Sequence, residues 1–103
     1  MNVIIDLIFK QVISEYFEFR GYKVPDESEA FDFLVSEIGE LADARVQARS
    51  DEWVRNNPDK PRNIENEAAD VLMMLIAFCM ASNIDLVHAL RVKLESKGYK
   101  WPK

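Results

Sequence analysis

Cysteine, histidine, glycine and proline are all scarce in this chain. Its 103 residues include one cysteine, one histidine, three glycines and four prolines. A single cysteine, Cys79, excludes an internal disulfide, so a reducing compartment and a cytoplasmic location are expected. The low glycine and proline content excludes collagen-like and low-complexity chains. An ordered globular domain is therefore predicted.

The sequence also lacks a long hydrophobic run. The longest one, Val71 to Ala81, has about half of the ~20 residues that a membrane span requires. The N-terminal segment has Asp6 within its apolar part, no basic start and no small-residue cleavage site, so it predicts a helix of the mature protein rather than a signal peptide. No membrane association is expected.

Basic residues are too few for a nucleic-acid surface. Against 18 acidic residues there are 13 basic ones, which gives a formal net charge of −5. Binding to nucleic acid or to an anionic membrane calls for a basic patch, whereas an acidic chain suits a cation site. The length fits one domain over residues 1–103 whose small core needs help from a partner chain.

Apolar residues recur at helical spacing in four segments, and no segment alternates as a strand does. We therefore predict an all-α fold, an antiparallel helical bundle of about four helices that is completed by oligomerisation. The first helix ends at Gly21, and the second begins at a capping box of Asp26 and Glu29 and ends near Arg49 or Trp53. The third helix spans Ile64 to Ser82. The fourth begins after Asp85 and ends near Gly98. The segment "NNPDKPRN" predicts a loop between the second and third helices.

Two of these helices carry acidic pairs on faces that border the core. On the third helix, Glu67 and Asp70 share an arc of roughly 100° with apolar residues, and on the second helix Glu37 lies on a flank of small residues with Glu40 beside it. Both pairs have i, i+3 spacing, so each projects two carboxylates from one face. Two such helices side by side would form a four-carboxylate pocket.

Clustered carboxylates repel one another at low dielectric unless a cation or protons neutralise them. Oxygen-only ligands favour Mg²⁺, with Mn²⁺ as the alternative. A ferritin-like diiron site needs Glu-x-x-His motifs, and the only histidine, His88, follows neither pair at that spacing. The plainer interpretation, two acidic pairs on solvated helix faces, stays open at this point.

The four acids and their surroundings resemble the MazG-like all-α nucleoside triphosphate pyrophosphohydrolases. That family has Glu-x-x-Glu, a spacer and Glu-x-x-Asp, which here read "EIGE" (Glu37, Glu40) and "EAAD" (Glu67, Asp70). The segments "LVSEIGELADA", "ENEAADVLMML" and "IDLVHALRVKLE" are similar to the family's three corresponding helical segments. The last of them contains the family's characteristic lysine, here Lys93.

The resemblance implies Mg²⁺-dependent hydrolysis of a (deoxy)nucleoside triphosphate to the monophosphate and pyrophosphate, which would cleanse the nucleotide pool. It implies that Glu37, Glu40, Glu67 and Asp70 hold the metal and that Glu37 or Glu40 acts as the general base. A homodimer or a dimer of dimers is expected. The phosphates are expected to contact three lysines of the C-terminal part, Lys93, Lys97 and Lys100.

The sequence departs from the family pattern at three positions. Ser36 stands where the family often has a further glutamate, and Lys97 and Lys100 stand where it commonly has an asparagine and an arginine. Lysine lacks the bidentate fork of arginine, so the phosphate contacts of this tail are an open point. Aromatic residues also remain open between base stacking and core packing. They are Tyr16, Phe17, Trp53 and Trp101.

Two other functions remain as alternatives. One is a non-catalytic α-helical interaction module whose acids hold a structural metal ion. The other keeps the reaction but acts on phosphoribosyl-ATP. Hydrolysis of a panel of triphosphates with Mg²⁺ distinguishes these three functions.

Overall fold

The computed structural model describes residues 2–59 and 64–102, with side chains from Leu7 onward. Within those ranges the chain is all-helical and has no strand. The helices are α1 (Asn2–Phe19), α2 (Glu27–Arg49), α3 (Asp51–Asn56), α4 (Ile64–Ala81) and α5 (Leu86–Glu95). No single described helix is long and apolar enough to cross a membrane, and only α4 and α5 taken together, with a 98° bend between them, reach that length and composition.

Local signals set the predicted helix ends. Asp26 and Glu29 form the capping box of α2, in which each side chain accepts a hydrogen bond from the backbone N–H of the other. The Asp85 carboxylate accepts from the His88 N–H and caps α5. Gly21, with φ +74°, ends α1 in a left-handed conformation that glycine adopts without a steric penalty. The prediction of these three ends is confirmed.

The second predicted helix ends at Arg49, the earlier of its two predicted ends, and a separate short helix, α3, follows it. Ser50 ends α2, and its Oγ accepts from the Trp53 N–H at 3.1 Å, so the same residue begins α3. A serine side chain competes for backbone N–H groups and favours such a break. The predicted loop at "NNPDKPRN" contains Pro58 and Asp59 in a turn, and its residues 60–63 lie outside the described part of the chain.

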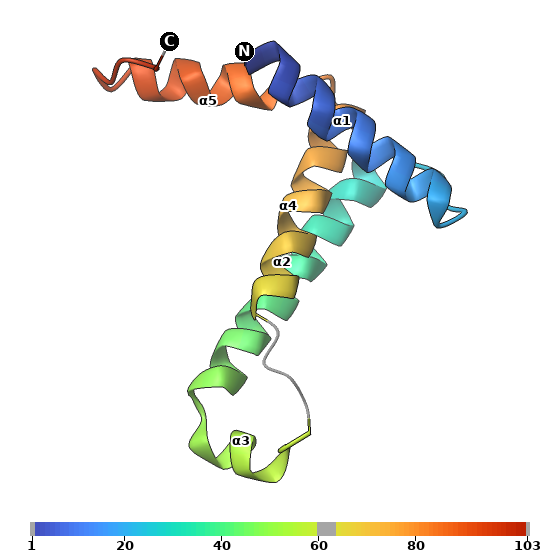
Figure 1. The fold of residues 1–103 in the computed structure, drawn as a ribbon, viewed down its shortest axis with the longest axis vertical. Coiled ribbons are helices and arrows are strands. Elements are labelled where there is room, and N and C mark those ends of the chain that lie inside the picture. The colour runs from blue at the N-terminus through green and yellow to red at the C-terminus, as the bar shows by residue number, and fades with distance from the viewer. Residues whose placement is uncertain (1, 60–63, 103) are drawn as a thin grey trace.

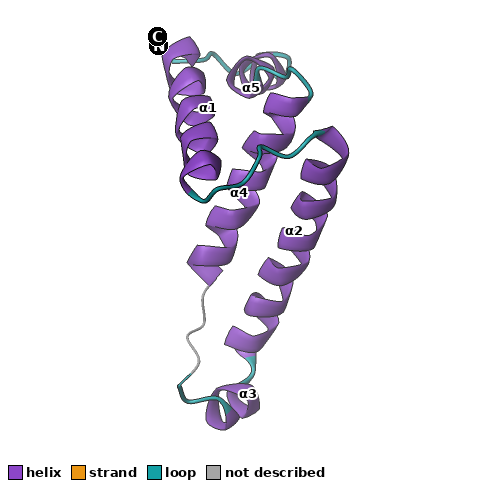
Figure 2. Ribbon diagram, turned by 90° about the vertical axis from the view of Figure 1, so that its right-hand side faces the viewer, coloured by secondary structure: helices purple, strands orange, loops and turns teal. Residues whose placement is uncertain are grey.

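The centre of the fold is the pair of α2 and α4, which lie side by side and antiparallel (Figures 1 and 2). Ala30 of α2 and Ala77 of α4 are fully buried, because small side chains let the two helices and α1 approach closely. Phe17 of α1 and Met74 of α4 complete this buried cluster. The other main contacts between helices are those of α1 with α4 and α5, and of α3 with α2.

The chain is open rather than compact. Its radius of gyration is 16.8 Å, whereas about 13 Å is usual for a compact domain of this length. None of the described large side chains is fully buried. α5 extends away from the α2–α4 pair, and α1 lies across the upper end of that pair (Figure 1). The described helices of a single chain therefore do not form a closed four-helix bundle.

Candidate functional site

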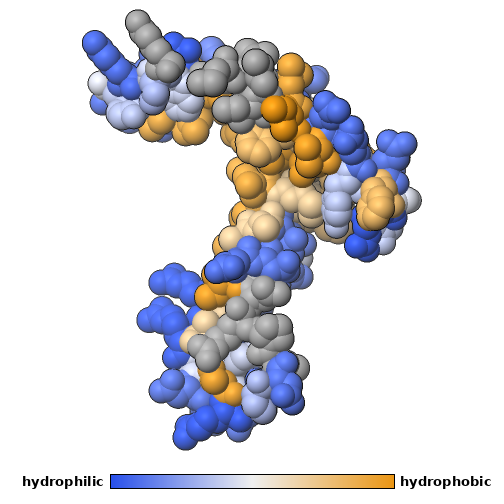
Figure 3. Space-filling view, viewed as in Figure 1, coloured by the Kyte–Doolittle hydropathy of each residue, from blue (hydrophilic) through white to orange (hydrophobic). Residues whose placement is uncertain are grey.

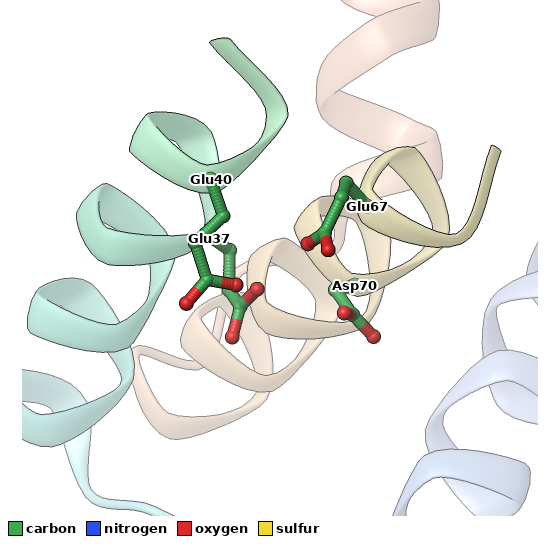
Figure 4. A group of neighbouring side chains, drawn as sticks. All are labelled: Glu37, Glu40, Glu67 and Asp70. Atoms are coloured by element: carbon green, nitrogen blue, oxygen red, sulfur yellow. The ribbon is translucent and has the colours of Figure 1, made fainter. Parts of the chain in front are cut away.

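Four carboxylates meet between α2 and α4. One carboxylate oxygen from each of Glu37, Glu40, Glu67 and Asp70 lies within 4.8 Å of the other three. The side chains point toward one another across the space between the two helices (Figure 4). Because α2 and α4 run side by side, each i, i+3 pair projects toward the other helix.

The cluster is partly removed from water. Glu37, Glu67 and Asp70 are half-buried, and Glu40 is exposed. One oxygen of Glu37 (Oε2) and one of Glu67 (Oε2) are buried without a hydrogen-bond partner in the described structure. Such unpaired buried acceptors are costly, so this arrangement suits a ligand that supplies positive charge or protons.

The electrostatics of the cluster reflect mutual repulsion. Burial, followed by the neighbouring Glu40 carboxylate and the charges of Asp70 and Glu67, raises the pKa of Glu37 to about 7. Burial and the negative charges of Glu40 and Asp70 also raise the pKa of Glu67. Among the described residues, no lysine or arginine forms an ion pair with any of the four. Within residues 2–59 and 64–102, no basic side chain therefore neutralises this negative charge.

The four oxygens fit a small divalent cation. All are carboxylate oxygens, which are the ligands that Mg²⁺ and Mn²⁺ prefer. The two buried oxygens without partners would gain one, and the cation would offset the burial and the repulsion that raise the pKa of Glu37. Glu40 is exposed, so one side of the cluster is open to solvent.

The three candidate lysines do not join the cluster within one chain. Lys93, on α5, and Lys97 and Lys100, which follow it, are all exposed. Asp70 precedes the end of α4 by eleven residues, roughly 16 Å along a helix axis, and α5 then leaves at 98°. Sequence spacing does not specify that angle, because it depends on contacts between α1 and α5.

A pocket that was not predicted from the sequence borders α2 one helical turn before Glu37. It has a volume of about 380 Å³ and is lined by residues of α1, the following loop and α2. Phe33 precedes Glu37 by one helical turn, so the pocket adjoins the carboxylates along α2. The i, i+4 spacing of Phe33 and Glu37 was the available signal. The lining residues are Phe17, Tyr22, Lys23, Pro25, Glu29 and Phe33.

The aromatic residues considered for base stacking have different surroundings. Phe17 is buried in the core and also lines this pocket. Tyr16 contacts it edge-on, with ring centroids 5.9 Å apart. Trp53 lies on α3 and Trp101 near the C-terminus, both half-buried and away from the pocket lining. Of the four, only Phe17 lines this pocket.

Comparisons with protein-family models, curated proteins and solved structures find no match to this chain. What the site can do is therefore inferred from its own geometry and chemistry.

Proposed function

We propose that this protein is a Mg²⁺-dependent nucleoside triphosphate pyrophosphohydrolase. The observation that carries the proposal is the convergence of four carboxylates within 4.8 Å, with two buried oxygens that lack partners. The order and spacing of the four acids, which resemble those of MazG-like enzymes, support the choice of reaction.

Glu37, Glu40, Glu67 and Asp70 would hold the metal ion. When bound, Mg²⁺ supplies positive charge to phosphate oxygens and makes a coordinated water more acidic. Mn²⁺ is the alternative ion, because it accepts the same oxygen ligands.

Glu37 is one of the two proposed proton acceptors. Its pKa of about 7 describes the metal-free site, and a bound cation would lower it, so Glu37 would accept a proton only through an oxygen that the metal does not hold. Glu40 is exposed at the mouth of the cluster and so faces the place where the phosphates would lie. Both residues can therefore receive the proton of the attacking water, with Glu37 favoured by its buried position.

The aromatic pocket beside the cluster suits the nucleobase. Phe33 lies one turn from Glu37, and the side chains of Phe17 and Tyr22 line the same pocket. Base stacking on an aromatic side chain contributes about 1–3 kcal/mol per base. Lys23 at the rim adds a hydrogen-bond donor, so the pocket can hold an aromatic ring while the phosphates reach the carboxylates.

Phosphate contacts from Lys93, Lys97 and Lys100 would come from a second subunit, because these exposed lysines lie on or beyond α5, which leaves the end of α4 at 98°. Mixing and refolding a Lys93→Ala variant with an Asp70→Asn variant tests this point. If the lysine acts across subunits, hybrid dimers should restore about a quarter of the wild-type activity. If it acts within its own chain, the mixture should stay inactive.

The decisive experiment is a substrate panel. Purified protein is incubated with Mg²⁺ and ribo- and deoxyribonucleoside triphosphates, with phosphoribosyl-ATP included, and monophosphate and pyrophosphate are measured. Glu40→Gln and Asp70→Asn should abolish turnover while far-UV circular dichroism is unchanged. Glu65→Gln, an exposed acid on α4 outside the cluster, is the matched control and should remain active.

A metal-dependent interaction module is the second candidate. Its supporting observation is that the cluster joins the two central helices of a chain with a small core, so a cation there would hold α2 and α4 together. If Mg²⁺ raises the melting temperature but no substrate of the panel is cleaved, the site is structural and the hydrolase proposal fails.

A further inference from the structure

The aromatic pocket carries one acidic and one basic side chain besides its rings. Glu29 of α2 and Lys23 of the preceding loop line it, and both are exposed, whereas Phe17 on its inner wall is buried. Figure 3 shows the corresponding change along the surface, with hydrophobic side chains where α1 crosses the upper part of α4 and hydrophilic ones around the end of α1. A planar ligand in the pocket would therefore meet apolar faces together with one carboxylate and one ammonium group.

The start of α2 holds Glu29 in place. Its Oε1 accepts a hydrogen bond from the Asp26 N–H at 3.3 Å, and the Glu29 N–H donates to the Asp26 carboxylate at 2.9 Å. Each carboxylate oxygen has two lone pairs, so Glu29 can accept further hydrogen bonds while this capping box stays intact. Because the side chain is restrained before a ligand arrives, binding costs less conformational entropy.

Contacts within the chain also hold Tyr22 at the rim of the pocket. Its N–H donates to the Phe17 carbonyl at 2.8 Å, which closes the turn after α1. The Arg20 guanidinium lies 5.8 Å from the centroid of the Tyr22 ring, a cation–π contact. Among the described residues, no ion pair engages the Lys23 ammonium, so it can donate to a ligand.

Guanine is the common nucleobase that best matches these two charged groups. On its Watson–Crick edge, the 2-amino group and N1–H are neighbouring donors, and O6 beside them is an acceptor. A carboxylate only accepts hydrogen bonds and presents two oxygens, whereas an ammonium only donates. Adenine and cytosine set a ring-nitrogen acceptor beside their amino group, and that acceptor would face a carboxylate oxygen unfavourably. Uracil and thymine offer one N–H between two carbonyls.

We propose that Glu29 selects a guanine base in the aromatic pocket by accepting from its N1–H and 2-amino group, while Lys23 donates to its O6. The substrate of the hydrolase is then a guanine nucleoside triphosphate. For the reaction this inference rests on the proposed function, whereas the binding of the base can be measured without turnover.

Two monophosphates that differ only in the 2-amino group test the contact. Deoxyguanosine monophosphate (dGMP) and deoxyinosine monophosphate (dIMP) are titrated into metal-free protein, and binding is followed by NMR chemical-shift changes. The wild type should bind dGMP about tenfold more tightly than dIMP, because dIMP loses a hydrogen bond to a charged group. Lys23→Met should weaken both ligands by a similar factor, since both retain O6.

Glu29→Gln separates recognition of the base from capping of the helix. Glutamine can keep the capping box, because its side-chain oxygen also accepts from the Asp26 N–H, but it replaces one acceptor by a donor. The preference for dGMP should therefore fall to about one, with the melting temperature little changed. Glu27→Gln, an exposed acid of the same first turn outside this pocket lining, should keep the preference. A wild type that binds both ligands equally or binds neither, or a Glu29→Gln variant that keeps the preference, overturns the proposal.

Turnover distinguishes failure of this inference from failure of the hydrolase proposal. With Mg²⁺, kcat/KM should be about tenfold higher for dGTP than for dITP. If dGMP binds preferentially but dGTP is not cleaved, the hydrolase proposal fails and guanine recognition stands. If dGTP, dITP and dATP are cleaved with equal kcat/KM, the hydrolase proposal stands and guanine recognition is overturned.

Discussion

Metal binding at the carboxylate cluster should depend steeply on pH, because Glu37 must lose a proton before it can bind a cation. Burial and the neighbouring carboxylates raise the pKa of Glu37 to about 7, so at that pH about half of the metal-free molecules carry the proton. Protons and metal compete for the same oxygen. Lowering the pH therefore weakens binding, and raising it strengthens binding until Glu37 is fully ionised.

The size of the effect follows from that pKa. Competition with one proton at a pKa of about 7 should make the dissociation constant for Mg²⁺ about tenfold larger at pH 6 than at pH 8. If Glu37 alone exchanges the proton, about half a proton should be released per ion bound at pH 7. The pKa of Glu67 is also raised, so its contribution acts in the same direction.

Isothermal titration calorimetry at pH 6, 7 and 8 measures both quantities, if buffers of different ionisation enthalpy are compared. Glu37→Gln should bind more weakly and with a smaller pH dependence, whereas Glu65→Gln should behave as the wild type. A dissociation constant that does not change between pH 6 and pH 8, with no proton release, would refute the link between Glu37 and the metal.

Four further predictions concern stability and substrate binding. The folded state raises the pKa of Glu37 and Glu67 above the ordinary value, so the metal-free protein should melt at a higher temperature as the pH falls from 8 toward 5.5. Saturating Mg²⁺ should remove this trend. A metal-free melting temperature that falls as the pH is lowered over this range would contradict the prediction. Glu67→Gln should raise the metal-free melting temperature and abolish the increase in melting temperature caused by Mg²⁺. Phe33→Ala should raise KM for the triphosphate with little change in kcat. Gly21→Ala should cost about 1 kcal/mol of unfolding free energy in denaturant titrations, because φ is +74° there, and an unchanged midpoint would contradict the assigned backbone.

Local sequence signals predicted most helix ends correctly. Asp26, Gly21 and Asp85 act through hydrogen bonds or backbone angles within a few residues of themselves. The end of α2 at Arg49 was one of two predicted ends, whereas the separate helix α3 was not predicted, because Trp53 continues the apolar spacing of α2. A serine followed by two acidic residues is itself a helix-start signal. A short-range signal therefore existed for the fifth helix as well.

The convergence of the acids was predictable, because two adjacent antiparallel helices must bring their facing i, i+3 pairs together. The position of Lys93 could not be predicted, because the 98° bend between α4 and α5 depends on contacts between residues distant in sequence. The aromatic pocket depends likewise on α1 lying across the pair, which brings Phe17 and Tyr22 to Phe33. Periodicity assigns a residue to a face, and tertiary packing decides what covers that face.

The central claim is that a divalent cation binds between α2 and α4, and anomalous diffraction from crystals grown with Mn²⁺ tests it most directly. A manganese peak should lie between the two helices, within coordination distance of carboxylate oxygens from both Glu37 or Glu40 and Glu67 or Asp70. Saturated crystals without a peak at that position, or with these acids paired to basic side chains instead, would contradict the claim.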